Sequence, residues 1–425
     1  MVNRIARNEY LDWLKRWREK QIIKVVSGVR RSGKSTLFDI YRDYLLGNGV
    51  EKEQVIMLNF EDIEYENLSD YRLLYDYVTE RLAPDKMNYI FLDEIQHVAA
   101  FEKAVDSLFL KKNCDVYITG SNAWFLSSDL ATVLSGRYVE LKMLPLSFRE
   151  YYTGLEETKQ HGLSKREKFE RYLEFSSFPY ILRFELNKRE TREYLQGLYN
   201  TVLLNDIVAR KKITDVEQLK KVVRFMLHNI GNKTSATKIA NTLRSSGSGA
   251  DQKTVGKYLD GLTESLLLYE APRYNIKGKQ YLTTQPKYYA VDIGLRNMLV
   301  RGKESDIGHI LENVVYLELL RRGYEVYVGE IDDGEVDFVA RNDEGLEYYQ
   351  IAATTLDEET LARELAPFRK ITDNYPKTLL TLDDVFGAAD YDGIKKRNLP
   401  EWLLEQAEYS GHFLMCRPPD PASSD

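Results

Sequence analysis

Residues 28 to 35 read Gly-Val-Arg-Arg-Ser-Gly-Lys-Ser, in which two glycines are followed by a lysine and a serine. The glycines let the backbone curl so that successive N–H groups face phosphate oxygens, and Lys34 reaches the β- and γ-phosphates. An apolar run, Ile22 to Val26, precedes this loop, and a helical pattern from Lys34 to Leu46 follows it. This order places the positive end of a helix at the phosphates. The chain is therefore predicted to bind a nucleoside triphosphate; the alternative is a glycine-rich turn without nucleotide.

The predicted nucleotide site is continuous in sequence, with ATP as the ligand and Mg²⁺ as its metal ion. Its residues are Gly28, Val29, Arg30, Arg31, Ser32, Gly33, Lys34, Ser35 and Thr36. The Ser35 hydroxyl is predicted to ligate the Mg²⁺. No motif that would read the base is visible, so these residues do not separate ATP from GTP.

Apolar runs and helical patterns alternate through the rest of the N-terminal third. The runs are Gln54 to Phe60, Asn88 to Leu92, Asp115 to Thr119 and Tyr138 to Leu144, and the helical patterns are Tyr71 to Leu82 and Phe101 to Lys111. Strands that alternate with helices of this length predict an α/β fold with a parallel sheet covered on both faces.

Two acids, Asp93 and Glu94, follow directly after one of these apolar runs. Open α/β sheets bind their ligands at the carboxyl ends of the strands, which is where these acids would lie. Asp93 is predicted to hold Mg²⁺ through water, and Glu94 to polarise the attacking water. A merely solvated strand end is the alternative, and the preceding phosphate loop disfavours it. Glu61 and Asp62 end the preceding strand near the same edge.

The next two strands add weaker candidates. Ser121 and Asn122 follow the strand that ends at Ile118-Thr-Gly, and either polar side chain could touch the γ-phosphate and orient the water, although such a sequence is also typical of a turn. Arg137 opens the last strand, where a cation could stabilise the phosphoryl transition state in its own or a neighbouring subunit. A solvated surface arginine is equally compatible with the spacing.

These strings together resemble a large bacterial and archaeal group of AAA+-like ATPases with an uncharacterised C-terminal region. The segments that carry the resemblance are the phosphate loop, Phe-Leu-Asp-Glu-Ile-Gln, Ile-Thr-Gly-Ser-Asn, Leu-Ser-Gly-Arg-Tyr, Leu-Pro-Leu-Ser-Phe-Arg-Glu-Tyr, Phe178-Pro179, Tyr289-Ala-Val-Asp292 and the chain from Glu312 onward. The resemblance implies that Lys34 and Ser35 bind nucleotide and that Asp93 and Glu94 serve the metal and the water. It also implies that Asn122 or Ser121 is the sensor residue that contacts the γ-phosphate, and that Arg137 is the arginine finger.

Length and composition set the outer limits. A chain of 425 residues suggests about three domains, and 43% hydrophobic and 29% charged residues describe a soluble globular protein. No apolar run is long enough to span a bilayer, so we expect a cytoplasmic protein without a membrane partner. The predicted parts are an ATPase domain (1–150), a helical lid or connector (151–208), a winged-helix domain (209–300), a nuclease-like domain (301–417) and a disordered tail (418–425).

A basic segment lies within this acidic chain. Residues 210–260 carry a net charge of +7, whereas the whole chain carries −7. Three helical patterns and a hairpin follow one another here, the order of a winged helix, and the third helix would present Lys253, Thr254 and Lys257 to a DNA major groove. Lys277 and Lys279 lie in the turn of the hairpin. The alternative is a module that only packs against the ATPase domain or a neighbouring subunit.

The C-terminal part resembles restriction-endonuclease-like folds, in which carboxylates gather a metal ion and a lysine assists the water. Glu312 on a helix and Asp337 at the start of a strand match two of these positions. Gln350 stands where the second carboxylate would be, and Ala352 where the lysine would be. Because neither replacement can perform the lost role, the nuclease site is predicted to be inactive.

The sequence thus predicts a Mg²⁺-dependent ATPase that binds ATP or ADP and couples its nucleotide cycle to DNA binding or remodelling. A homo-oligomer is expected if Arg137 acts in a neighbouring subunit. The alternatives are an ATP-gated signalling or defence switch that acts on protein partners, and a DNA-cleaving enzyme in which other residues compensate for Gln350 and Ala352.

Overall fold

The computed structural model describes residues 4–120, 134, 136–156, 158, 162–245, 247, 249–300, 307–332, 334–385 and 387–405. They form two compact units, 6–143 and 144–405, and residues 4–5 belong to the second unit. Within these ranges no helix is both long and apolar enough to cross a membrane. The finer division into five parts stays a prediction.

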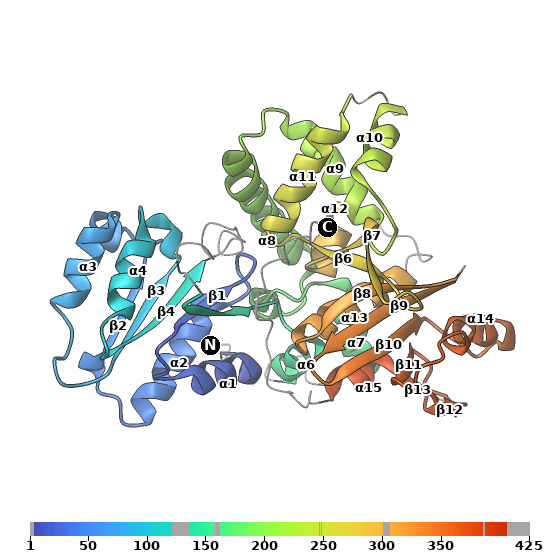
Figure 1. Cartoon of the computed structure of the whole chain (residues 1–425), viewed down its shortest axis with the longest axis horizontal. Helices are drawn as coiled ribbons and strands as arrows, with labels where there is room; N and C mark the ends of the chain where they lie inside the picture. The colour runs from blue at the N-terminus through green and yellow to red at the C-terminus, as the bar shows by residue number, and fades with distance from the viewer. Residues whose placement is uncertain are drawn as a thin grey trace, which may run out of the picture. The chain divides into compact units, whose positions relative to one another are not determined.

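The first unit is built on a five-stranded parallel sheet (Figure 1). Its strands are β1 (Ile23–Ser27), β2 (Val55–Asn59), β3 (Asn88–Asp93), β4 (Cys114–Gly120) and β5 (Tyr138–Lys142), in the order β2-β3-β4-β1-β5. Its helices are α1 (Asn8–Trp17), α2 (Lys34–Gly47), α3 (Tyr71–Thr79) and α4 (Phe101–Phe109). The predicted α/β fold with a parallel sheet is confirmed.

Each face of this sheet has its own apolar core, because successive strand residues point to opposite faces. Val26 of β1 packs with the α1 and α2 side chains, whereas its neighbour Val25 packs with those of α3 and α4. All five residues of β1 are buried, as a central strand covered on both faces requires. The phosphate loop therefore leaves the sheet at its most buried strand.

The second unit begins with helices. They are α6 (Phe148–Glu156), α7 (Lys165–Glu174), a 3₁₀ segment (Pro179–Phe184), α8 (Lys188–Thr201), a π-helical segment (Val202–Ala209), α9 (Val216–His228), α10 (Ala236–Ser245) and α11 (Gln252–Glu264). Asp215 and Asp251 accept hydrogen bonds from backbone N–H groups at the starts of α9 and α11, which explains where these helices begin. The predicted order of three helices before a hairpin is present.

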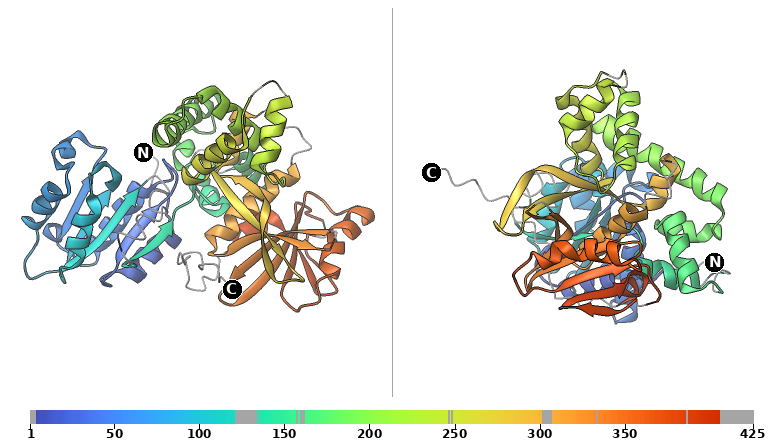
Figure 2. Two further views of the ribbon diagram at one scale, coloured as in Figure 1. Left: turned by 45° about the horizontal axis from the view of Figure 1, so that its top comes forward. Right: turned by 90° about the vertical axis from the view of Figure 1, so that its right-hand side faces the viewer.

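An eight-stranded sheet completes this unit. Its strands are β6 (Leu268–Asn275), β7 (Gln280–Ala290), β8 (Glu325–Ile331), β9 (Gly334–Asn342), β10 (Gly345–Ala352), β11 (Lys377–Thr381), β12 (Ala389–Tyr391) and β13 (Ile394–Asn398). The remaining helices are α12 (Ile293–Leu299), α13 (Ile307–Arg321), α14 (Glu358–Arg369) and α15 (Leu399–Leu404). The β6–β7 hairpin follows α11 and also pairs with β8, so the predicted wing is an edge of the C-terminal sheet (Figure 2).

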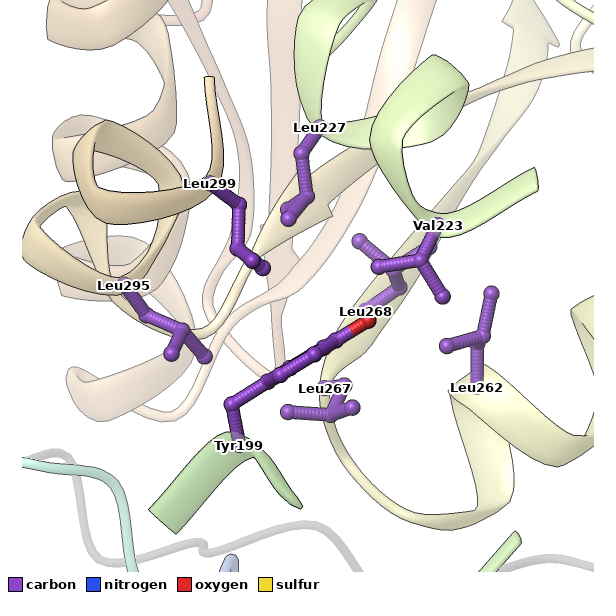
Figure 3. Close-up of a pocket in the computed structure, with 8 residues that line it drawn as sticks. All are labelled: Tyr199, Val223, Leu227, Leu262, Leu267, Leu268, Leu295 and Leu299. Atoms are coloured by element: carbon purple, nitrogen blue, oxygen red, sulfur yellow. The ribbon is translucent and has the colours of Figure 1, made fainter. Parts of the chain in front are cut away.

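Helices α8, α9, α11 and α12 converge with β6 around a small apolar cavity of about 10 Å³ (Figure 3). It is lined by Tyr199, Val223, Leu227, Leu262, Leu267, Leu268, Leu295 and Leu299. A space of this size holds at most one water molecule, and the Tyr199 hydroxyl is the polar group of an otherwise apolar lining. The cavity is a packing gap between helices.

Candidate active site

The phosphate loop runs from the end of β1 to the start of α2. A side chain at Gly28 would place its Cβ only 2.3 Å from the Met143 carbonyl oxygen, so no other residue fits there. Gly33 has a φ of 106°, in the left-handed region that favours glycine. The two glycines that define the motif are therefore required by the backbone geometry of the loop.

Lys34 is folded back into the loop. Its Nζ donates to the carbonyl oxygens of Gly28 and Val29 at 3.0 and 3.3 Å, and lies 3.6 Å from a Glu94 oxygen. The side chain is buried, and burial lowers its pKa despite the nearby charges of Glu94 and Asp93. A desolvated ammonium that the neighbouring acids compensate only in part favours a further anion beside it.

The loop has the features expected of a phosphate site. The Ser32 hydroxyl is buried and has no hydrogen-bond partner among the described residues. The N-cap of α2 is Gly33, which has no side chain to cap the helix, so within the described part of the chain the first backbone N–H groups of α2 remain for a ligand. Arg7 donates to the Ser32 carbonyl oxygen at 3.0 Å and braces the loop, and Arg31 has a positive φ of 65° at its tip. The residues present fit a bound triphosphate.

The two predicted acids lie at the carboxyl end of β3, and both are buried. Asp93 interacts with the Ser35 hydroxyl, so the two predicted Mg²⁺ ligands are brought together. Burial raises the pKa of Asp93, although hydrogen bonds from Ser35 and Thr119 oppose the shift. Glu94 has a φ of 53°, a conformation that costs a non-glycine residue about 1 kcal/mol and is typical of functional positions.

Thr119, near the end of β4, is a site residue that the sequence analysis did not select. Its hydroxyl donates to Asp93 and accepts the backbone N–H of Glu94 at 2.9 Å, so one side chain positions both acids. At this strand end the sequence predicts roles for Ser121 and Asn122, which lie outside the described residues. Thr119 carries no signal of its own in the sequence, because its place beside the acids depends on the register in which β4 pairs with β3, Ile118 with Leu92.

Arg137 is not brought to the phosphate loop of its own chain. It precedes β5, whose first residue Tyr138 pairs with Ile23 at the start of β1, whereas the loop follows the other end of β1. In a parallel sheet these ends are separated by the strand length, about 13 Å. Arg137 instead lies 3.3 Å from Asp106 on α4. This position is compatible with a surface arginine, and also with a role in another copy of the chain.

The predicted DNA-contacting residues differ in how exposed they are and in whether their charge is already paired. Lys253 and Lys257 on α11 and Lys279 in the hairpin turn are exposed. Thr254 is half-buried, and its backbone N–H is bound by Asp251 at 2.6 Å. Lys277 lies 2.7 Å from Asp332, so part of its charge is neutralised within the unit.

Glu312 of α13 and Asp337 of β9 are buried beside a third charged residue, Lys287 of β7. Lys287 Nζ lies 3.2 Å from Glu312 and 2.7 Å from Glu335. Burial alone would lower the pKa of Lys287, but the charges of Glu312, Asp337 and Glu335 outweigh it and raise the pKa. Together, Lys287, Glu312, Glu335 and Asp337 are called the carboxylate centre. Gln350 bridges it to α14, since its side chain binds the Asp337 N–H at 3.2 Å and Glu364 at 2.9 Å.

A parallel sheet in the order β2-β3-β4-β1-β5, with a phosphate loop after β1 and two acids after β3, defines a P-loop nucleoside triphosphatase domain. Residues 20–152 match the family described as an AAA domain, and residues 166–306 match a domain of unknown function (DUF8612). The first unit is thus an AAA-type ATPase domain.

The chain is 39% identical over 402 residues to an uncharacterized protein of Haemophilus influenzae, covering 94% of this chain and 99% of that protein. It is 28% identical over 379 residues to an uncharacterized protein of Methanocaldococcus jannaschii, covering 85% and 82% of the two chains. Among solved structures, the Walker-type ATPase PABY2304 of Pyrococcus abyssi is 15% identical, with 70% of this chain and 96% of that chain covered and a TM-score of 0.49. The chain belongs to the family of the Haemophilus protein.

Proposed function

We propose that this AAA-type ATPase is Mg²⁺-dependent and couples ATP binding and hydrolysis to DNA binding or remodelling. The observation that carries the ATPase part is the convergence of Lys34, Asp93 and Glu94 at one edge of the sheet. Ser35 and Asp93 would hold Mg²⁺, which supplies positive charge to the phosphate oxygens when bound. Lys34 adds a second positive charge, and the Glu94 carboxylate orients the attacking water by accepting a hydrogen bond from it.

The surface of α11 supports DNA as the partner. Lys253 and Lys257 are exposed on either side of Gly256, and a Cβ at Gly256 would have no neighbour within 4 Å. A glycine inside a helix costs about 1 kcal/mol relative to alanine, and packing does not require one here. A small residue between two lysines lets a phosphate backbone approach the helix closely.

The nuclease-like part is proposed to be inactive. Lys287 supplies a positive charge inside the carboxylate centre, where a nuclease would gather a metal ion. Gln350 and Ala352 provide neither the missing carboxylate nor a second ammonium group. The carboxylate centre thus balances its charges with the chain's own residues.

ATP turnover by the purified chain, with and without DNA, tests this function. Single-stranded, duplex and branched DNA are compared at low and moderate salt, with Lys34→Ala as the blank. We expect turnover that Lys34→Ala abolishes and that one DNA form stimulates, less so as salt rises. Turnover that Lys34→Ala retains would contradict the site, and turnover that no DNA changes would contradict the DNA coupling.

The DNA surface is tested by a double variant. Lys253→Ala with Lys257→Ala is expected to weaken DNA binding and to reduce its salt dependence, because two phosphate contacts are lost. The matched control is Lys165→Ala with Lys188→Ala, since these lysines of the same unit pair with Glu401 and Glu174. Equal effects of the two double variants would contradict a specific role for α11.

One observation favours the alternative, an ATP-gated switch that acts on protein partners. Several lysines of the basic segment are already paired within the chain: Lys211 with Glu264, Lys220 with Glu217 and Lys233 with Glu335. Its positive charge is therefore partly neutralised. Turnover that is indifferent to DNA but changes with protein concentration would favour this switch.

Arg137 is proposed to act on the site of a neighbouring copy in a homo-oligomer. Arg137→Ala would then abolish turnover, and mixing it with Lys34→Ala would restore part of it, because some interfaces would combine an intact loop with an intact arginine. No restoration in the mixture would remove the support for action between subunits.

A further inference from the structure

We propose that Glu61, Glu94 and His97 form a metal site for a divalent transition cation such as Zn²⁺, distinct from the Mg²⁺ position, and that its occupancy inhibits ATP hydrolysis. The inhibitory part rests on the proposed function, in which Glu94 orients the water. The binding part rests only on the geometry of the three side chains. Each part has its own measurement.

Adjacent strand ends bring the three residues together. Glu61 lies two residues beyond β2, and Glu94 directly follows β3, which is parallel to β2 and pairs with it at Asn59 and Asp93. His97 ends the single 3₁₀ turn that follows Glu94. One potential ligand atom from each of the three side chains lies within 4.8 Å of the others. Tetrahedral ligands at about 2.1 Å from a metal are about 3.4 Å apart, so small side-chain rotations suffice to close the site.

The donor set selects the kind of cation. Mg²⁺ prefers an octahedral shell of oxygen ligands, which Ser35, Asp93, phosphate and water can supply. An imidazole nitrogen with two carboxylates instead suits Zn²⁺ and its neighbours among the transition metals. Three protein ligands leave a fourth position open for water. The two metal positions should therefore be occupied by different cations.

A pocket of about 360 Å³ gives a cation access to the site. Glu61 and His97 are exposed and line it, together with the acids Asp62 and Glu66, whereas Glu94 is buried. The three acids and one histidine of the lining attract a cation. Because a ligand atom of Glu94 lies within 4.8 Å of those of Glu61 and His97, the buried acid is near a cation held by the two exposed residues.

The present contacts of the two carboxylates are ones that a metal can displace. Glu61 pairs with Arg30 at 2.9 Å, but its side chain is 47% exposed, and such surface pairs contribute only about 0–1 kcal/mol. Glu94 accepts a hydrogen bond from Gln96 at 2.6 Å and lies 3.6 Å from Lys34. A carboxylate oxygen that ligates a metal has fewer lone pairs for a water molecule. Coordination of Glu94 would thus withdraw it from hydrolysis.

Direct binding of Zn²⁺ to the full chain, without nucleotide, tests the site. Competition with a fluorescent zinc chelator should show one ion bound at this site per chain. His97→Ala and Glu61→Gln should each weaken the affinity by at least about 10-fold, the loss typical of even an indirect partner of a metal ligand. His228→Ala is the matched control, because His228 is an exposed histidine at the end of α9. Equal affinities of the wild type and both site variants would overturn the site.

Inhibition is tested with saturating Mg²⁺ and ATP, and each variant is compared with its own zinc-free rate. Zn²⁺ should inhibit the wild type and His228→Ala at the concentration that fills the site, and His97→Ala should need at least about 10-fold more. Zinc binding that is lost in His97→Ala without any change in inhibition would overturn the inhibitory role. If the chain hydrolyses no ATP, the chelator experiment still decides the metal site, so the two failures are distinguishable.

Discussion

Two lysine–carboxylate groups in this chain contain similar side chains and differ in their surroundings. In the ATPase domain, Lys34 is the first residue of α2, directly after the phosphate loop, and Asp93 and Glu94 lie at the carboxyl end of the parallel strand β3. In the carboxylate centre, Lys287 comes from within β7, and Asp337 comes from within β9 of the same sheet. The pKa of Lys34 is lowered because burial dominates, whereas the pKa of Lys287 is raised because three acids outweigh burial.

This contrast shows that composition alone does not separate a ligand site from a structural ion cluster. A lysine whose charge is poorly compensated, on a loop with free helix N–H groups, favours an incoming anion. A lysine that already lies between two carboxylates has its counterions within the chain, and removing it leaves buried charge uncompensated. The two groups therefore differ in whether the lysine lies at a ligand-accepting helix N-terminus or inside a cluster of acids.

Replacing Lys287 and Lys34 by methionine, each in its own variant, tests this comparison most directly. Lys287→Met is expected to lower the free energy of unfolding of the second unit by about 3 kcal/mol, because Glu312 and Glu335 lose the cation that they share and retain His309 and Lys233. Lys34→Met should abolish ATP hydrolysis and change stability much less. Denaturant unfolding, with hydrogen exchange of peptides from α13 and β9, measures the first effect. Equal stability losses in the two variants would contradict the comparison.

Thr119→Val tests how far ATP hydrolysis depends on the residue that positions Asp93 and Glu94. Without the hydroxyl that binds both Asp93 and the Glu94 backbone, kcat should fall about 100-fold, with little change in stability. Thr191→Val is the matched control, since the Thr191 hydroxyl is buried and has no hydrogen-bond partner among the described residues. Steady-state turnover of both variants gives the result, and an unchanged kcat in Thr119→Val would exclude the positioning role.

A second buried ion pair, Lys396 with Asp383, makes the stability of the second unit depend on pH. Burial opposes ionisation of Asp383, but hydrogen bonds from Lys396, Thr354 and the Thr355 backbone hold its pKa at about 2. Because this pKa is depressed, its stabilisation, about 2 kcal/mol, is present above pH 4 and is lost as the pH falls towards 2. Acid unfolding of Asp383→Asn should show a flatter pH dependence over this window. An unchanged profile would show that the pair contributes little.

Gly256→Ala tests whether the exposed surface of α11 serves DNA binding at the cost of helix stability. Alanine should stabilise α11 by about 0.5–1 kcal/mol, since its Cβ meets no atom within 4 Å, yet it should weaken DNA binding if a phosphate backbone approaches there. Gly197→Ala in α8 is the matched control, because its Cβ would also meet nothing. Thermal unfolding and DNA titration measure the two effects. Stabilisation without any loss of DNA binding would remove Gly256 from the interface.

The sequence predicted the ATPase domain well because its signals are local. The phosphate loop needs only a strand, two glycines and a helix in succession, and Asp93 and Glu94 need only the end of a buried strand. The direction of the strands also contained the answer for Arg137: a residue that opens a parallel strand lies at the edge opposite the loop.

The sequence by itself determined the class of the first unit and the order of α9, α10 and α11 before a hairpin, and it predicted the residues of the nucleotide site. Only the tertiary structure decided that Lys287 enters the carboxylate centre, that β6 and β7 join the C-terminal sheet and that Thr119 holds both acids. The physical reason is that strand pairing is not local. Apolar runs and caps are read along the chain, whereas a hydrogen bond between neighbouring strands depends on the order and register that the whole sheet adopts.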